Sequence, residues 1–102
     1  MTWKEFDLEQ WAEETGIDLE ELRQKEKLIK KIIKARKEFG LTQKELAHLV
    51  GVSQSRIAQI ESRVGMDKIT FDVLLRVLQV MGFGFSISAR KIREPDLETL
   101  VA

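Results

Sequence analysis

The chain has 102 residues, of which 43% are hydrophobic and 33% are charged, and its formal net charge is zero. This length suits one small domain with an appendage. The absence of cysteine excludes disulfides and thiolate metal sites, no apolar run approaches the roughly 18 residues of a membrane span, and no export signal opens the chain. We therefore expect a soluble, cytoplasmic protein that makes no use of a membrane, a metal or another cofactor.

The charges are distributed unevenly along the chain. Residues 1–26 carry three bases and nine acids, residues 27–93 carry fourteen bases and five acids, and residues 94–102 carry three acids. A basic middle between acidic ends is typical of a nucleic-acid-binding module whose ends serve another purpose. The alternative is that the charge blocks are only solvated faces.

Residues 1–17 are expected to form a short, separate helix. Thr2 and Glu5 have the spacing of a capping box, in which each side chain bonds the other residue's backbone amide. Both tryptophans of the chain lie here, in an acidic setting. They either fold back and extend the core or anchor a protein partner. The candidate anchors are Trp3, Phe6 and Trp11.

The next helix is expected to run from Leu19 to Phe39. Asp18 and Glu21 mark its start, and Gly40 marks its end. The apolar spacing lapses over residues 24–27, which predicts a break there. The basic residues of its remaining surface are Lys27, Lys30, Lys31, Lys34 and Lys37.

Two short helices are predicted within residues 42–62. Thr42 and Glu45 form a capping box for the first, Gly51 suits a left-handed turn after it, and Ser53 caps the second. Two helices that meet at a tight glycine turn form a helix-turn-helix unit, whose second helix fits a DNA major groove. The expected buried residues are Leu46, Ala47, Leu49, Val50, Ile57 and Ile60, with Val52 at the corner between the helices.

This stretch resembles the motif of the Cro and lambda-repressor (XRE) family throughout its length. The matching residues are Gln43, Leu46, Ala47, Gly51, Val52, Gln54, Ile57, Ile60 and Glu61. An ordinary helical hairpin would need these residues in place by chance. The resemblance implies an all-α, lambda-repressor-like domain of four to five helices over residues 27–82, with double-stranded DNA as its ligand.

The resemblance also implies roles for individual residues. Base contacts fall to the side chains that face a groove when Ile57 and Ile60 point inward, namely Gln54, Ser55, Arg56 and Gln59. Phosphate contacts are expected from Gln43, which would also brace Gln54, and from Lys44, Ser62, Arg63 and Lys68. An ion pair between Arg36 and Glu61 would lock the second motif helix to the preceding long helix, unless Arg36 is simply an exposed base.

After a polar loop over residues 62–69, Thr70 is expected to cap a helix from Phe71 to Met81. That helix is apolar nearly all round, so it needs a cover on more than one side. Phe83–Ser88 then alternates with the period of a β-strand, and a strand needs a backbone partner. A second copy of the chain supplies both, which predicts a homodimer; the alternative is a tail extended over the helices. The expected interface residues are Val73, Val77, Val80, Phe83, Phe85 and Ile87.

These features predict a sequence-specific repressor that binds an inverted repeat as a homodimer. Residues 1–26 would be an acidic helical extension, residues 83–93 a dimerising strand with a basic segment, and residues 94–102 an acidic tail. The helix followed by a strand resembles antitoxins of the HigA and HipB type, which implies autorepression and a toxin partner, either a RelE-fold ribonuclease or a HipA-like kinase. A stand-alone or phage-type regulator and a protein-binding adaptor are the alternatives. Catalysis is not expected, because the single histidine, His48, lies at a surface position and cysteine and tyrosine are absent.

Overall fold

A computed structural model of the chain describes residues 9, 10, 16 and 18–98. Its elements are α2 (Leu19–Glu38), α3 (Gln43–Val50), α4 (Gln54–Ser62), the short 3-10 helix η2 (Met66–Lys68) and α5 (Phe71–Val80). The expected all-α architecture is confirmed, and within the described ranges no residue belongs to a β-strand. No described helix is both long and apolar enough to cross a lipid bilayer. The helix expected over residues 1–17, with Trp3, Phe6 and Trp11, falls almost wholly outside the described residues.

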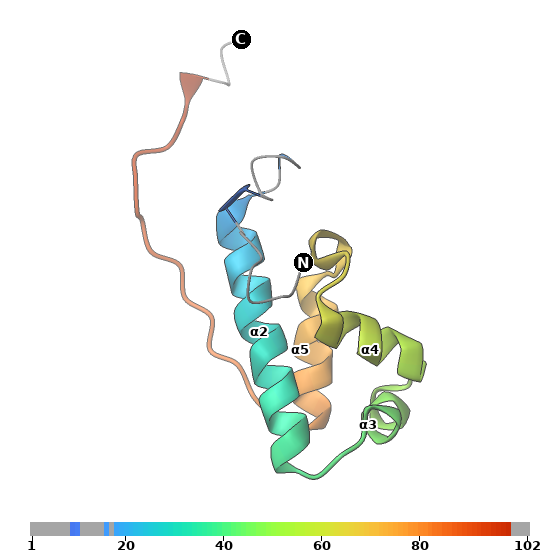
Figure 1. Cartoon of the computed structure of the whole chain (residues 1–102). Coiled ribbons are helices and arrows are strands. Elements are labelled where there is room, and N and C mark those ends of the chain that lie inside the picture. Colours follow the sequence, from blue (N-terminus) through green and yellow to red (C-terminus); the bar gives the residue numbers. More distant parts are fainter. Residues whose placement is uncertain (1–8, 11–15, 17, 99–102) are drawn as a thin grey trace.

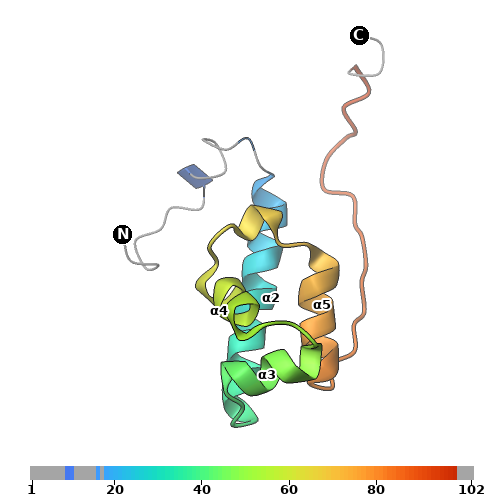
Figure 2. The same cartoon turned by 90° about the vertical axis from the view of Figure 1, so that its right-hand side faces the viewer.

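The helices pack around one core, with α2 and α5 lying side by side and α3 and α4 crossing one flank of this pair (Figures 1 and 2). The residues after α5 leave the bundle as an extended arm. The buried core is made by Leu22, Ile29, Ile32, Ala35, Leu46, Ala47, Val50, Ile57, Ile60, Met66, Ile69, Leu74, Val77, Leu78 and Met81.

Helix α2 runs without interruption, so the break predicted over residues 24–27 is wrong. Its start is as expected, because the Asp18 carboxylate accepts a hydrogen bond of 3.0 Å from the Glu21 amide. The apolar pattern lapses because Lys25, which is only 4% exposed, occupies a core position. Its ammonium donates to the Asp67 carbonyl at 3.2 Å and lies 5.5 Å from the centre of the Phe71 ring. A long aliphatic stem can therefore fill an apolar position when its charged end finds polar partners.

The two short helices begin as the sequence predicts. The Glu45 amide donates to the Thr42 hydroxyl at 3.0 Å, and the Thr42 amide donates to the Glu45 carboxylate at 2.9 Å. Gly51 adopts a left-handed backbone with φ of 84°, and the Ser53 hydroxyl accepts from the Arg56 amide at 3.1 Å. These local bonds fix where α3 ends and where α4 starts.

Two residues of the motif are less buried than expected. Leu49, predicted to lie on the buried side of α3, is 52% exposed. Val52, predicted to fill the corner between α3 and α4, is 37% exposed. The buried residues of α3 are Leu46, Ala47 and Val50. Because only one side of a short surface helix faces the core, Leu49 remains largely exposed.

The segment after α4 is not simply a polar loop. It contains η2, and both Met66, the first residue of η2, and Ile69, the residue after it, are fully buried. Both side chains belong to the core, and η2 packs against α2. The spacing of three residues in a 3-10 turn brings both onto one face, which the helical and strand periods of the sequence do not reveal.

The C-terminal part departs from expectation at Val77, whereas the strand expected over Phe83–Ser88 needs a second copy of the chain and stays a prediction. Val77 is 0% exposed and belongs to the core of a single chain, so it cannot form a dimer interface. Phe83–Ser88 forms no strand in the single chain. Phe83 packs against the core, and the Lys31 ammonium lies 5.3 Å from its ring centre, whereas Phe85 and Ile87 are 38% and 82% exposed. Extended backbone becomes a strand only when a neighbouring strand supplies hydrogen bonds.

Candidate nucleic-acid interface

Helix α4 has one buried and one exposed face. Ile57 and Ile60 are 0% and 1% exposed and anchor it to the core. On the other side the side chains are polar and accessible, with Arg56 only partly covered by its neighbours. An α-helix with such a face fits the width of a DNA major groove, where glutamine, serine and arginine can bond base edges. The residues on this face are the four expected from the sequence, Gln54, Ser55, Arg56 and Gln59.

The far end of α4 is tied to α2 by Arg36 and Glu61. Arg36 Nε lies 2.6 Å from one carboxylate oxygen of Glu61, and Nη2 lies 2.8 Å from the other. Arg36 Nη1 also donates to the Leu41 carbonyl at 2.9 Å. The hydrogen bond to Glu61 raises the pKa of Arg36, and burial opposes that shift only in part. The pair therefore fixes the direction of α4, because a guanidinium and a carboxylate joined at both edges cannot rotate independently.

Gln43 contributes to the same brace. Its side-chain amide donates to Glu61 Oε1 at 3.2 Å, so α2, α3 and α4 meet at one carboxylate. From the sequence, Gln43 is expected to brace Gln54 at the start of α4. In the structure the amide nitrogen of Gln43 bonds Glu61, the residue before the last in α4, and the contact with Gln54 stays a prediction.

Arg56 and Gln59 contact each other on the exposed face of α4. Arg56 Nη1 donates to Gln59 Oε1 at 3.0 Å. The two residues are three positions apart, so one turn of helix brings their side chains together. The candidate base-reading residues thus include a hydrogen-bonded pair before any DNA is bound.

The candidate phosphate contacts have different surroundings. Lys44 and Lys68 are exposed near the ends of α3 and η2. The Ser62 hydroxyl donates to the Gln59 carbonyl at 2.7 Å and accepts from the Val64 amide at 3.3 Å, so it also closes the end of α4. Burial lowers the pKa of Arg63, and the carboxylate of Glu26 opposes only part of that shift. Arg63 is half-buried, so it is less accessible to a phosphate than the two exposed lysines.

One further stabilising residue was not anticipated. Arg76 of α5 donates from Nη2 to the Val50 carbonyl at 3.2 Å, which satisfies an acceptor at the end of α3. A Cβ at Gly51 would lie 4.0 Å from the same nitrogen. In the sequence, Asp72, Arg76 and Gln79 form a single polar stripe on an otherwise apolar helix, but this spacing does not indicate which carbonyl Arg76 bonds.

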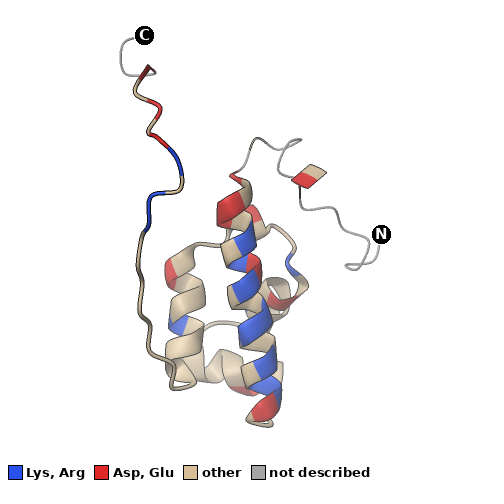
Figure 3. Cartoon of the chain, turned by 90° about the vertical axis from the view of Figure 1, so that its left-hand side faces the viewer, with Lys and Arg blue, Asp and Glu red and all other residues tan. Residues whose placement is uncertain are grey.

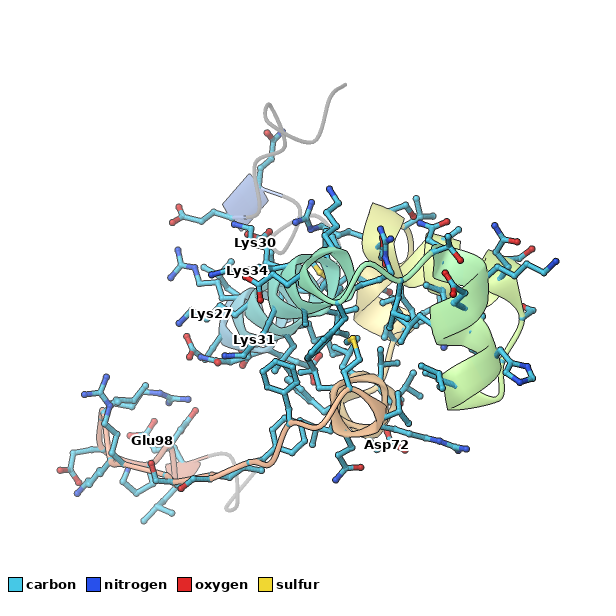
Figure 4. The ribbon with its side chains drawn as sticks, turned by 90° about the horizontal axis from the view of Figure 1, so that it is seen from below. Lys27, Lys30, Lys31, Lys34, Asp72 and Glu98 are labelled. Atoms are coloured by element: carbon cyan, nitrogen blue, oxygen red, sulfur yellow. The ribbon has the colours of Figure 1, made fainter. Side chains whose placement is uncertain are left out.

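The lysines of α2 lie on another face of the domain. Blue residues follow the outer side of α2 in Figure 3, and Lys27, Lys30, Lys31 and Lys34 project away from α3 and α4 in Figure 4. Lys30 pairs with Glu26 at 3.0 Å along the same helix. These lysines therefore lie on a different face of the domain from α3 and α4.

Nothing in the described part of the chain indicates a metal centre. No three or more histidine, aspartate or glutamate side chains gather there in a way that could hold an ion. His48, the single histidine, is exposed on α3.

Comparison with known proteins found one matching family model and a similar bacterial protein. Residues 32–87 match a family model described as Helix-turn-helix. The chain is also 33% identical over 91 residues to a protein of Haemophilus influenzae named as an uncharacterized HTH-type transcriptional regulator. That match covers 89% of this chain and 88% of the relative. No solved structure matches the chain.

Proposed function

Because the chain belongs to the Cro and lambda-repressor (XRE) family of helix-turn-helix DNA-binding proteins, we propose that it represses transcription by placing α4 in the major groove of a specific DNA site. The observation that carries this proposal is the pairing of an exposed polar face on α4 with a fixed orientation of that helix. Gln54, Ser55, Arg56 and Gln59 supply the base-reading groups. The shielded Arg36–Glu61 pair holds them in one direction.

Phosphate contacts would position the domain on the duplex. Lys44, in the first turn of α3, precedes α4 in the sequence, and Lys68, in η2, follows it. Both side chains are exposed. The positive end of the α3 dipole attracts a phosphate to the same place as Lys44. Such contacts supply affinity and salt dependence, whereas the α4 side chains supply sequence preference.

The repressor would act as a homodimer on an inverted repeat. Support comes from the C-terminal arm, because Phe85 and Ile87 expose apolar surface that a single chain leaves uncovered, and Val80 at the end of α5 is 38% exposed. Pairing the arm with its copy would supply backbone partners for Phe83–Ser88 and cover these side chains. The two α4 helices would then read half-sites about 34 Å apart. With Val77 excluded, the proposed interface consists of Val73, Val80, Phe83, Phe85 and Ile87.

In its more specific form, the proposal is that the protein is the antitoxin and autorepressor of a toxin–antitoxin operon. It rests on the resemblance of a helix followed by an apolar extended segment to HigA- and HipB-type antitoxins. The proposed toxin anchor is the acidic segment that holds Trp3, Phe6 and Trp11. A gene for a small toxin beside this one, together with co-purification that is lost on deletion of residues 1–17, would support the antitoxin role. Without such a neighbour, the stand-alone regulator is the better description.

The test of DNA reading is footprinting on the DNA upstream of the protein's own gene. Wild-type protein should protect a short inverted repeat, and protection should weaken steeply as salt rises. Arg56→Ala should abolish the footprint, and Lys34→Ala should leave it intact, because Lys34 lies on the outer face of α2. A normal footprint with Arg56→Ala would refute the assignment of α4 as the reading helix.

A further inference from the structure

The outer side of α2 carries a continuous line of positive charge, which we call the basic stripe. Its members follow one another at intervals of four and three residues, so they share one face of the helix. The buried residues of α2 lie on the opposite side of the helix. Figure 3 shows the stripe as a run of blue along α2. The basic stripe consists of Arg23, Lys27, Lys30, Lys34 and Lys37, all of them exposed.

The charges of the basic stripe are only partly balanced within α2. Lys30 pairs with Glu26 at 3.0 Å, and Lys34 lies 4.0 Å from Glu38. Lys27 has no acidic partner in the part of the chain that the structure describes. The stripe therefore attracts a further acidic group, and the segment that precedes α2 is rich in them. Its acids are Glu5, Asp7, Glu9, Glu13 and Glu14.

One contact already joins this acidic segment to the basic stripe. Arg23 Nη2 donates to Glu9 Oε1 at 3.0 Å. Glu9 and Gln10 are helical, and Gly16 has a left-handed φ of 71°, which suits a turn between two helices. Glu9 lies seven residues before Gly16 and Arg23 lies seven residues after it. The contact thus has the register of two antiparallel helices joined by a turn at that glycine.

This register specifies the next contact. Both helices of such a hairpin advance by about 1.5 Å per residue, so residues one turn farther from the glycine on each helix meet again. Glu5 lies one turn before Glu9, and Lys27 lies one turn after Arg23. An acid therefore occupies the position that faces Lys27. Glu5 itself lies outside the described residues, so its pairing with Lys27 is inferred from the register and the charges.

We propose that the basic stripe is a docking surface for the chain's own acidic N-terminal segment, which binds there as a helix antiparallel to α2. The helix is held by the Glu9–Arg23 pair and by a second pair one turn away. Exposed ion pairs are individually weak, but the covalent connection through Gly16 keeps the two charged surfaces at a high effective concentration. A helix docked in this way turns Trp3 away from α2, because residues two positions apart point in nearly opposite directions. Trp3 is then accessible to a protein partner.

Zero-length cross-linking with a carbodiimide tests this docking in the full chain. The reagent joins a carboxylate to an amine only where the two groups are in contact, and peptide mass spectrometry identifies the joined residues. A mixture of unlabelled and isotope-labelled protein shows whether a cross-link forms within one chain or between two copies. Circular dichroism of each variant verifies that the helices are intact.

Wild-type protein should give a cross-link between Glu5 and Lys27 within single chains. Raising the salt concentration to about 0.5 M should lower its yield about fivefold, because salt screens exposed charges. Arg23→Glu should lower the yield similarly, because it sets two carboxylates against each other. The double variant Arg23→Glu/Glu9→Arg restores opposite charges and should recover the yield. The control is Lys44→Glu, which reverses an exposed base on α3 and should leave the yield unchanged.

Three results would overturn the proposal. The first is the absence of the Glu5–Lys27 cross-link at low salt, and the second is a yield that Arg23→Glu leaves unchanged. The third is a cross-link found only between labelled and unlabelled chains, because the acidic segment would then dock on a second copy. None of these results depends on DNA, so the docking and the reading of DNA by α4 can fail separately.

Discussion

Arg36 of α2 and Glu61 of α4 form a two-edged ion pair, with N–O distances of 2.6 and 2.8 Å, and their side chains are only 13% and 8% exposed. They are 25 positions apart in the chain, so the pair joins two elements rather than stabilising one helix. Removing one partner leaves the other charge shielded from water without its counter-charge. The pair therefore holds α4 in a fixed orientation against α2.

We predict that Arg36→Ala and Glu61→Ala each lower the free energy of unfolding by about 3 kcal/mol. Urea denaturation monitored by circular dichroism measures the change. Arg23→Ala is the matched control, because the Arg23–Glu9 pair is 3.0 Å long but its side chains are 49% and 69% exposed. Arg23→Ala should lower the free energy of unfolding by less than about 1 kcal/mol. Equal losses in Arg36→Ala and Arg23→Ala would show that the buried pair has no special role.

The capping box of α3 makes stability depend on pH. The pKa of Glu45 is lowered, first by the hydrogen bond from the Thr42 backbone amide and then by that with the Thr42 side chain. Because the folded pKa lies below the unfolded one, this contribution is present above the ordinary glutamate pKa of about 4.3 and is lost as the pH falls through the lowered folded value. We predict that Glu45→Gln reduces the loss of stability on acidification in this range.

Thermal unfolding between neutral pH and about pH 3 would measure this effect. Asp72 contributes in the same direction, because its hydrogen bond with the Thr70 side chain lowers its pKa. The control is Glu38→Gln, since Glu38 is exposed and lies 4.0 Å from Lys34. An identical acid profile for Glu45→Gln and wild-type protein would contradict the prediction.

The turn after α4 is part of the core, and we predict that Ile69→Ala lowers the free energy of unfolding by about 2–5 kcal/mol. Ile69 is 0% exposed, so its truncation leaves a cavity that the surrounding helices fill only partly. Val64→Ala, in the same connection but at a residue that is 67% exposed, should change stability by less than about 0.5 kcal/mol. Chemical denaturation of both variants checks this, and a neutral Ile69→Ala would show that the turn is peripheral.

Lysines on the two sides of the domain should differ in their effect on DNA binding. We predict that Lys44→Ala reduces the magnitude of the slope of log affinity against log salt by about 1 and weakens binding to all sequences alike. Lys34→Ala should leave the slope unchanged, because Lys34 projects away from α3 and α4 (Figure 4). Fluorescence anisotropy titrations at several salt concentrations measure both slopes. A larger effect from Lys34 would place the DNA on the outer face of α2.

Bonds between residues close in sequence were predictable. Asp18 with Glu21, and Thr42 with Glu45, bond across three positions, and the turn at Gly51 needs only a left-handed backbone. The partition of α4 into buried and exposed faces follows from the period of Ile57 and Ile60, which is also a local property. Residue types and spacing carry all of this information.

Contacts between distant residues were predicted less well. Lys25 lies 42 positions from Asp67, whose carbonyl accepts its hydrogen bond, and no local pattern relates the two. The bond from Gln43 to Glu61 spans 18 positions, and the sequence pattern did not reveal it. The Arg36–Glu61 pair came from the family resemblance, because composition and spacing alone do not join α2 to α4.

The sequence by itself determined where the helices begin, where the chain turns and which face of α4 is polar, because each depends on neighbours within one turn. Only the tertiary structure decided that Lys25, Met66, Ile69 and Val77 are buried and that Leu49 is not. The physical reason is that burial depends on what lies opposite a side chain. Helices from distant parts of the chain supply that opposite surface. The alternating pattern of Phe83–Ser88 predicts a strand, but a strand forms only when a neighbouring strand supplies hydrogen-bond partners, and residues 83–88 have none in the single chain.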